Sequence, residues 1–198
     1  MDLQLWARAV EFHGHTCFGL AMGYHVATLA LETLATYRAP DEQIVAVVEN
    51  DNCSVDAIQI ITGCTLGKGN LIYRDYGKKV YTFFLRTTKK GIRITVQGPE
   101  MSEYPELTEL QAKVKANQAT PEDKIALAQK QQEAILHYLN KPPTEVCTVS
   151  EAQDHLPARA RMFNTLTCHF CGEEMMEPRA RVKDGQFACI PCADLYLR

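Results

Sequence analysis

The C-terminal segment carries two pairs of cysteines with the spacing of a metal site. Cys168 and Cys171 form one pair, Cys189 and Cys192 form the other, and 17 residues separate the pairs. This spacing is typical of two short loops that together present four thiolates to one tetrahedral ion. We expect zinc, with a rubredoxin-like iron site as the alternative, because thiolates alone do not select the metal.

Four protein ligands would leave no open coordination position for a substrate, so the expected zinc is structural. Between the two pairs, Asp184 and Gly185 predict a tight hairpin turn, and Cys192 is expected to open a closing helical turn that runs to Tyr196. These features predict a small treble-clef or zinc-ribbon finger over residues 164–198 whose folding depends on the ion. Reduced cysteines without a ligand are the alternative interpretation.

A second group of metal-binding residue types lies near the N-terminus. His13, His15 and Cys17 fall within five residues, directly before an apolar stretch with helical spacing. Imidazole and thiolate are ligands for zinc and related divalent ions. If Cys17 begins the helix, the positive end of the helix dipole favours its thiolate form, either as a ligand or as a nucleophile. An ordinary capped loop with two histidines is the alternative.

Two further cysteines flank a predicted short helix. Cys53 and Asp56 are three residues apart, so they share a helix face, and Gln59 follows on the same side. Cys64 comes after this helix in a glycine-rich run, 63–70, that is one residue too short for a phosphate-binding loop. Cys53 and Cys64 are candidate metal ligands, and buried packing residues are the alternative.

The elements that must position these residues are helices mixed with strands. Apolar spacing predicts helices over 3–12 and 18–37, a buried strand over 44–50 and a helix over 54–62. Alternating β-branched and aromatic residues over 79–98 predict a hairpin that turns at Lys89-Lys90-Gly91. Residues 1–100 are therefore expected to form an α+β core of helices packed on a partly antiparallel sheet.

The middle of the chain is predicted to be helical. After Gly98-Pro99 the sequence is rich in Glu, Lys, Gln and Ala, and Leu107, Leu110 and Val114 share one helical face. Pro121 is expected to open a second helix, and residues 141–161 read as a connector with one short helix. We therefore expect three parts: the core over 1–100, a helical extension over 101–163 and the finger over 164–198.

Composition excludes several classes of protein. The chain of 198 residues is 46% hydrophobic and 23% charged, which is typical of globular proteins. Its net charge of −3 provides no basic surface of the kind that nucleic-acid binding needs. It contains no uninterrupted apolar run of about 18 residues and does not start as a secretory signal does, so we expect a cytoplasmic protein with reduced cysteines and no membrane contact.

Four segments together resemble the FmdE family of formylmethanofuran dehydrogenase proteins. That family typically carries HGHxC, E-x-x-x-C-x-x-D-A-x-Q and TGCTxGKGN segments and often a C-terminal zinc finger. Here they correspond to His13–Cys17, Glu49–Gln59, Thr62–Asn70 and Cys168–Cys192. Phe18 stands where many relatives have proline. The resemblance implies an α+β core with a polar metal-binding cavity, a treble-clef-like finger and a homodimer.

The family takes its name from operons for molybdenum or tungsten enzymes of one-carbon metabolism, so the resemblance implies such an enzyme complex as a candidate partner. Nothing in the chain resembles a molybdopterin-binding domain, so oxidoreductase activity of the chain alone is not expected.

Two hypotheses of different classes follow. In the first, a core site holds zinc, nickel or iron and leaves a position open for water or a small ligand, with Cys17 and Asp56 as the candidate catalytic residues and Asp56 as acid or base. The candidate ligands of that ion are His13, His15, Cys17, Cys53 and Cys64. In the second, the chain is a non-catalytic accessory protein that binds metal or a partner through the finger and the dimer surface.

Overall fold

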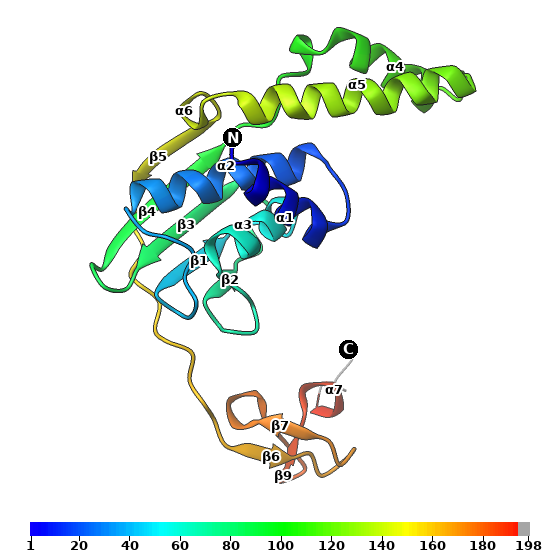
Figure 1. Ribbon diagram of the computed structural model, residues 1–198. Helices are drawn as coiled ribbons and strands as arrows, with labels where there is room; N and C mark the ends of the chain where they lie inside the picture. Colours follow the sequence, from blue (N-terminus) through cyan, green and yellow to red (C-terminus); the bar gives the residue numbers. More distant parts are fainter. Residues whose placement is uncertain (194–198) are drawn as a thin grey trace. The chain divides into compact units, whose positions relative to one another are not determined.

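The computed structural model describes residues 1–193. Two compact units divide the chain, the first over residues 1–159 and the second from residue 160 onward (Figure 1). The first unit contains the segment expected as the core and nearly all of the expected helical extension. The second unit contains all four finger cysteines.

A five-stranded sheet forms the centre of the first unit, in the order β2-β1-β3-β4-β5. β1 (Ile44–Val48) pairs in parallel with β2 (Leu71–Tyr73), whereas all other neighbouring strands pair antiparallel. The remaining strands are β3 (Val80–Leu85), β4 (Lys90–Val96) and β5 (Cys147–Glu151). The predicted α+β fold with a partly antiparallel sheet is confirmed.

Helices α1 (Leu3–His13), α2 (Phe18–Thr33) and α3 (Ser54–Thr62) cover one face of this sheet (Figure 1). Because strand side chains alternate between faces, Ile44, Ala46 and Val48 of β1 pack into the main core beneath these helices. α2 is buried along most of its length, which matches its nearly continuous apolar sequence.

Glycines on α2 allow α3 to approach its backbone. A Cβ atom at Gly23 would lie 2.2 Å from the carbonyl oxygen of Ser54, and one at Gly19 would lie 2.9 Å from Cβ of Cys53. No larger residue fits at either position without displacement of α3. This close contact places the start of α2 beside the start of α3.

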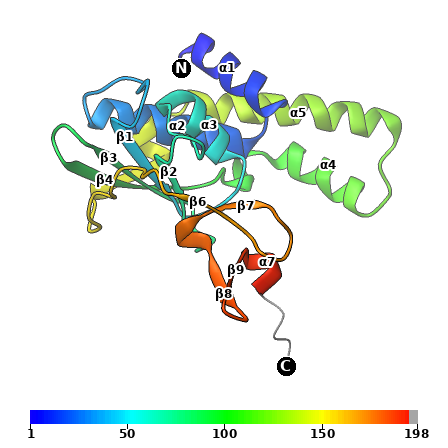
Figure 2. The same ribbon diagram turned by 90° about the horizontal axis from the view of Figure 1, so that it is seen from below.

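The two middle helices form a hairpin in which α4 (Pro105–Lys115) lies beside α5 (Pro121–Asn140) (Figure 2). A 3₁₀ turn, Met101–Glu103, precedes α4. The Thr120 side chain accepts a hydrogen bond from the Asp123 backbone, and the Asp123 side chain accepts one from the Thr120 backbone, so a capping box fixes the predicted start of α5. The C-terminal half of α5 enters the main core through Ile135, Tyr138 and Leu139.

Two predicted boundaries are wrong. α2 ends at Thr33 rather than near position 37, because Ala35 adopts a left-handed conformation with φ of 50°. The hairpin of β3 and β4 is confirmed, but its turn occupies residues 86–89, and Gly91 lies within β4. Gly91 pairs with Phe84, and a Cβ atom there would lie 2.6 Å from the Phe84 ring, so this glycine admits an aromatic ring rather than a turn.

The strands β2 and β5 were not expected from the sequence. β2 follows the glycine-rich run, and β5 lies in the segment expected to be a connector, directly after the short helix α6 (Pro143–Val146). Both are edge strands of the sheet.

The second unit consists of two small hairpins and short turns. β6 (Thr165–Thr167) pairs with β7 (Glu174–Met176), and β8 (Arg181–Lys183) pairs with β9 (Gln186–Ala188). Asp184 and Gly185 both have positive φ, which confirms the predicted tight turn. A 3₁₀ turn (Glu177–Arg179) and α7 (Ile190–Ala193) complete the unit. The expected helical turn starts within α7, and its residues 194–196 lie outside the described part of the chain.

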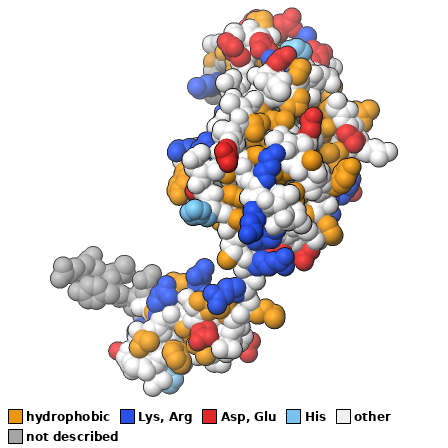
Figure 3. All heavy atoms as spheres, turned by 90° about the vertical axis from the view of Figure 1, so that its left-hand side faces the viewer, with side chains coloured by type: hydrophobic (Ala, Val, Ile, Leu, Met, Phe, Trp, Pro, Cys, Tyr) orange, Lys and Arg blue, Asp and Glu red, His pale blue; other side chains and the backbone are white. Residues whose placement is uncertain are grey.

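Hydrophobic side chains are exposed on the surface of the second unit (Figure 3). The cross-strand pair Val182 and Phe187 is 72% and 52% exposed, and Met176 is 51% exposed. A unit of this size buries too little apolar surface to fold through a hydrophobic core alone.

Among residues 1–193, no helix has the length and apolar character that a transmembrane span requires.

Candidate metal centres

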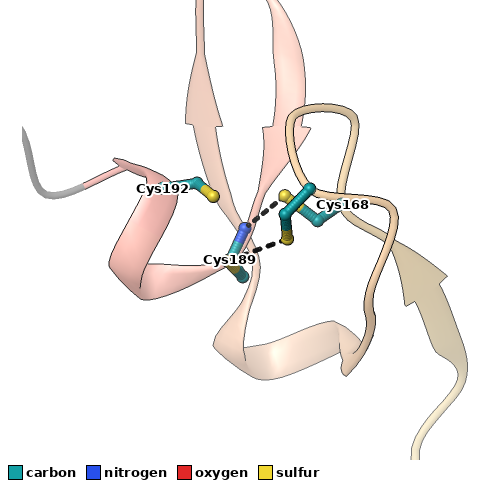
Figure 4. A group of neighbouring side chains, drawn as sticks. Cys168, Cys189 and Cys192 are labelled. Atoms are coloured by element: carbon teal, nitrogen blue, oxygen red, sulfur yellow. Dashed lines mark hydrogen bonds between the residues drawn. The ribbon is translucent and has the colours of Figure 1, made fainter.

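The structure brings the four finger cysteines together. One sulfur atom from each of Cys168, Cys171, Cys189 and Cys192 lies within 4.8 Å of the others. Figure 4 shows the side chains of Cys168 and Cys189 facing each other, with Cys192 contributed from α7. This is the donor set of a tetrahedral structural zinc site.

Backbone N–H groups donate hydrogen bonds that stabilise a thiolate in this cluster. The N–H of Cys189 donates a hydrogen bond to Sγ of Cys168 at 3.3 Å, and this bond is the main cause that lowers the pKa of Cys168 to about 6 (Figure 4). Hydrogen bonds to the neighbouring thiols of Cys189 and Cys171 instead raise the pKa of Cys192 to about 12. A divalent cation would stabilise all four as thiolates, so the residues present fit zinc.

The N-terminal donors also come together, at the junction between α1 and α2. One donor atom each of His13, His15 and Cys17 lies within 4.8 Å of the others. His13 is the last residue of α1, and Gly14 follows it with φ of 88°, which reverses the chain so that the histidine rings lie 4.4 Å apart. Nε2 of His13 lies 3.7 Å from Sγ of Cys17.

Cys17 occupies the N-cap of α2, as its position in the sequence predicted. Its Sγ accepts a hydrogen bond from the backbone N–H of Leu20 at 3.3 Å, in the way that a serine or aspartate oxygen caps a helix. The sulfur therefore lies at the positive end of the helix dipole.

Asp56 contacts His13 rather than standing free. Oδ2 of Asp56 lies 2.7 Å from Nδ1 of His13, and Nε2 of Gln59 donates a hydrogen bond to the other carboxylate oxygen at 3.3 Å. When Nδ1 carries the proton and donates a hydrogen bond to the carboxylate, Nε2 has a free lone pair on the side of Cys17. A carboxylate that orients a histidine in this way is a common second layer of metal sites.

Cys53 lies next to this cluster but is not part of the group of three donors. It precedes α3, and its thiol makes no cap hydrogen bond to the helix. Burial raises the pKa of the Cys53 thiol, and a hydrogen bond and charge interaction with Cys17 raise it further. A Cβ atom built at Gly19 would lie 3.6 Å from Sγ of Cys53 and 3.7 Å from Sγ of Cys17, so both sulfurs lie beside this glycine.

Cys64 is not brought to the cluster. Its side chain is fully buried, and its Sγ donates a hydrogen bond to the carbonyl oxygen of Ile44 at 3.4 Å. Burial raises the pKa of this thiol to about 11. Its surroundings therefore stabilise a neutral thiol that anchors the glycine-rich run to β1.

A cavity of about 370 Å³ adjoins the N-terminal cluster. It lies where the parallel strands β1 and β2 end, because Val48 and Tyr73 are paired at this edge of the sheet. Such an edge is the usual ligand position in parallel sheets. Its lining is His13, Val48, Asn50, Asp51, Asn52, Cys53, Val55, Asp56, Leu66, Leu71 and Tyr73.

Sequence reasoning missed some residues of this lining. Asn50 and Asp51 lie inside the segment that supplied Cys53 and Asp56, so their position after a buried strand was an available signal. Tyr73 belongs to β2, a strand that was not expected, and no sequence pattern pointed to it as a site residue.

Comparisons with known proteins match this architecture. The model of the family described as "FmdE, Molybdenum formylmethanofuran dehydrogenase operon" matches residues 12–148, a range that holds the N-terminal cluster and its cavity. A probable S-adenosyl-L-methionine-binding protein of Archaeoglobus fulgidus is 36% identical over 200 residues, covering 98% of this chain and 53% of the relative. The chain therefore spans about half the length of that curated relative.

A solved structure shares the fold. The crystal structure of a tungsten formylmethanofuran dehydrogenase FmdE-like protein from Syntrophus aciditrophicus matches with a TM-score of 0.60 at 18% sequence identity. The match covers 96% of this chain and 92% of that protein.

Proposed function

Because this chain belongs to the FmdE family, we propose that it is an FmdE-like metal-binding protein with two sites of different purpose. The finger cysteines hold a structural zinc, and the cluster at the start of α2 holds a second divalent ion beside a ligand cavity. The observation that carries the second site is the chain of contacts from Asp56 through His13 to Cys17.

The ligands of the proposed core ion are His13, His15 and Cys17. Three protein ligands leave at least one coordination position for water or a small molecule, unlike the closed set of four thiolates in the finger. A mixed imidazole and thiolate set suits zinc, with nickel and iron as alternatives. When bound, such an ion supplies a Lewis acid that can activate water or polarise a carbonyl group.

The chain's own residues would act around that ion. Asp56 holds the Nδ1 proton of His13 and so fixes the ring with Nε2 toward Cys17. Asp56 therefore serves as a positioning residue whose acid–base effect reaches the site through His13. Cys17 serves as a ligand, with its sulfur fixed by the backbone N–H of Leu20.

Metal analysis of the full-length chain tests this proposal. The wild type should bind two equivalents of divalent ion, Cys17→Ser and His13→Ala should each bind one, and Cys64→Ser should retain both because Cys64 lies outside the cluster. Two equivalents in Cys17→Ser would reject the core site.

The cavity suggests a second candidate function, the binding of a cationic organic ligand. Asp51 and Asp56 contribute carboxylates to its lining, and no Lys or Arg is among the described lining residues. The relative's name mentions S-adenosyl-L-methionine, whose sulfonium is a cation. Calorimetric titration with this compound and with S-adenosylhomocysteine, which lacks the sulfonium charge, tests the idea. Binding of neither compound would reject it.

We also propose that the chain forms a homodimer in the cytoplasm and associates with a molybdenum or tungsten enzyme complex. The operon in the family description supports the partner. The exposed hydrophobic side chains of the finger support the accessory alternative, in which the finger binds a protein rather than nucleic acid. Co-purification of the enzyme complex with wild type but not with Val182→Asp would support that alternative over a role for the core site.

A further inference from the structure

We infer that Cys17 and Cys53 form a redox pair that closes reversibly into a disulfide. The two residues belong to different helix starts and are separated by 35 intervening positions in the sequence. The inference goes beyond the proposed function, because a metal site requires no second thiol beside its ligand.

The packing of α2 against α3 brings the two sulfur atoms together. Gly19 lies between them, and a Cβ atom built there would lie 3.6 Å from Sγ of Cys53 and 3.7 Å from Sγ of Cys17. The two sulfur atoms therefore lie beside the same position, which is empty because residue 19 is a glycine.

The pair is also more accessible than the other thiols of the first unit. Cys17 and Cys53 are partly exposed, whereas Cys64 and Cys147 are buried. Cys53 lines the 370 Å³ cavity, so a small solute in this cavity reaches the Cys53 thiol.

The chemistry needs a two-electron oxidant, for which we name a hydroperoxide. The reaction starts from the Cys17 thiol, whose proton passes to the departing oxygen. The Cys17 sulfur then attacks the terminal peroxide oxygen, so that the O–O bond breaks, Cys17 becomes a sulfenic acid and an alcohol or water leaves with the proton. The Cys53 thiol attacks the sulfenic sulfur, the S–S bond forms and water leaves. Two thiols are oxidised, and one peroxide is reduced.

The disulfide would remove a ligand from the proposed core ion, and this consequence alone rests on the proposed function. A sulfur atom in a disulfide no longer binds a divalent ion as thiolate does. Conversely, an ion bound to Cys17 would protect the pair from oxidation. Oxidation and metal binding would therefore exclude each other at this site.

Peptide mapping of the full-length protein tests the pair. Metal-free protein is treated with increasing amounts of hydrogen peroxide, because the finger thiols also consume the oxidant. The remaining thiols are then alkylated, and the protein is digested with trypsin. Cleavage after Arg8, Arg38 and Lys68 separates peptide 9–38, which contains Cys17, from peptide 39–68, which contains Cys53 and Cys64. We expect these peptides to be joined by a disulfide that dithiothreitol breaks.

Two matched variants decide which thiol of the second peptide reacts. The cross-link should persist in Cys64→Ser and disappear in Cys53→Ser, in which the serine retains the shape of the side chain. A cross-link that survives in Cys53→Ser would overturn the pair. So would Cys17 sulfinic acid in the wild type with Cys53 still fully alkylated.

Addition of zinc before the peroxide separates this inference from the proposed function. Loss of the cross-link after zinc addition supports both the pair and the core metal site. A cross-link that forms equally with and without zinc supports the pair and rejects Cys17 as a metal ligand.

Discussion

Oδ2 of Asp56 lies 2.7 Å from Nδ1 of His13, although 43 positions separate the two residues along the chain. This contact ties the end of α1 to the first turn of α3. It orients the ring so that Nε2 faces Cys17, and it favours the tautomer with the proton on Nδ1. The acid–base role expected for Asp56 would therefore act through His13, and this arrangement has consequences that can be measured.

Replacement of Asp56 should weaken the core ion without removing any ligand. Asp56→Asn should lower affinity for the core ion by about 10- to 100-fold, as is usual when the partner of a metal-bound histidine is lost. Competition with a chromogenic chelator measures this change. Asp51→Asn is the control, because Asp51 lines the same cavity while the carboxylate that His13 contacts is that of Asp56. Equal losses in both variants would contradict the positioning role of Asp56.

Replacement of one finger cysteine should unfold the second unit alone. Cys168→Ser should remove one equivalent of zinc and leave residues 160–193 with fast amide exchange, while residues 1–159 keep their protection, because the two units have separate cores. Hydrogen exchange with mass spectrometry measures both units in one experiment. Val182→Ala changes the same unit but removes no zinc ligand, so this variant should retain the zinc. Unchanged zinc content in Cys168→Ser would show that the finger does not depend on this ligand.

The contact between α2 and α3 should tolerate no side chain at Gly23. Gly23→Ala places a Cβ atom 2.2 Å from the Ser54 carbonyl oxygen, so we expect a loss of unfolding free energy of roughly 1–3 kcal/mol or more. Gly67→Ala is the matched control, because a Cβ atom there meets nothing within 4 Å. Chemical denaturation compares the two. Equal stability of both variants would refute the close packing.

Buried His25 should make the first unit sensitive to acid. Burial lowers the pKa of His25 below its ordinary 6.5, and its Nε2 donates a hydrogen bond to the Tyr138 carbonyl at 3.0 Å. Between the lowered folded pKa and 6.5, the unfolded chain binds a proton that the folded chain does not. Stability from this group is therefore complete above about pH 6.5 and declines as the pH falls below it.

Denaturant unfolding at about pH 7 and about pH 5, on either side of the ordinary histidine pKa, measures this effect for His25. His25→Gln, which cannot titrate, should show a smaller loss of stability between the two pH values than the wild type. His155→Gln is the control, since His155 is exposed. An identical pH dependence in wild type and His25→Gln would exclude His25 as the cause.

The proposed homodimer predicts a specific mass in solution. Sedimentation equilibrium at micromolar concentration should give twice the chain mass of 22.2 kDa. The helices α4 and α5 or the finger are expected to form the contact. Ile125 on α5 is 62% exposed, so Ile125→Asp should weaken association through the helices. The finger variant Val182→Asp distinguishes the two surfaces. A monomer in the wild type would reject the dimer.

The sequence was sufficient to predict the parts whose geometry is local. The finger cysteines come in pairs with two residues between them, and His13, His15 and Cys17 lie within five residues, so short turns alone keep their donor atoms close. The amphipathic helices and the hairpin of β3 and β4 also follow from local periodicity. The ends of the elements were predicted less well. Gly91 was expected in the hairpin turn but lies in β4, where it makes room for the Phe84 ring.

Only the tertiary structure decided how distant segments meet. Cys53 and Cys64 look equivalent as candidate ligands in the sequence, yet the crossing of α2 and α3 at Gly19 and Gly23 brings Cys53 to Cys17, while the turn after α3 places Cys64 against β1. The packing of α1 against α3 brings Asp56 to His13. Helix crossing depends on which surfaces fit together in three dimensions, and spacing along one chain does not encode that fit.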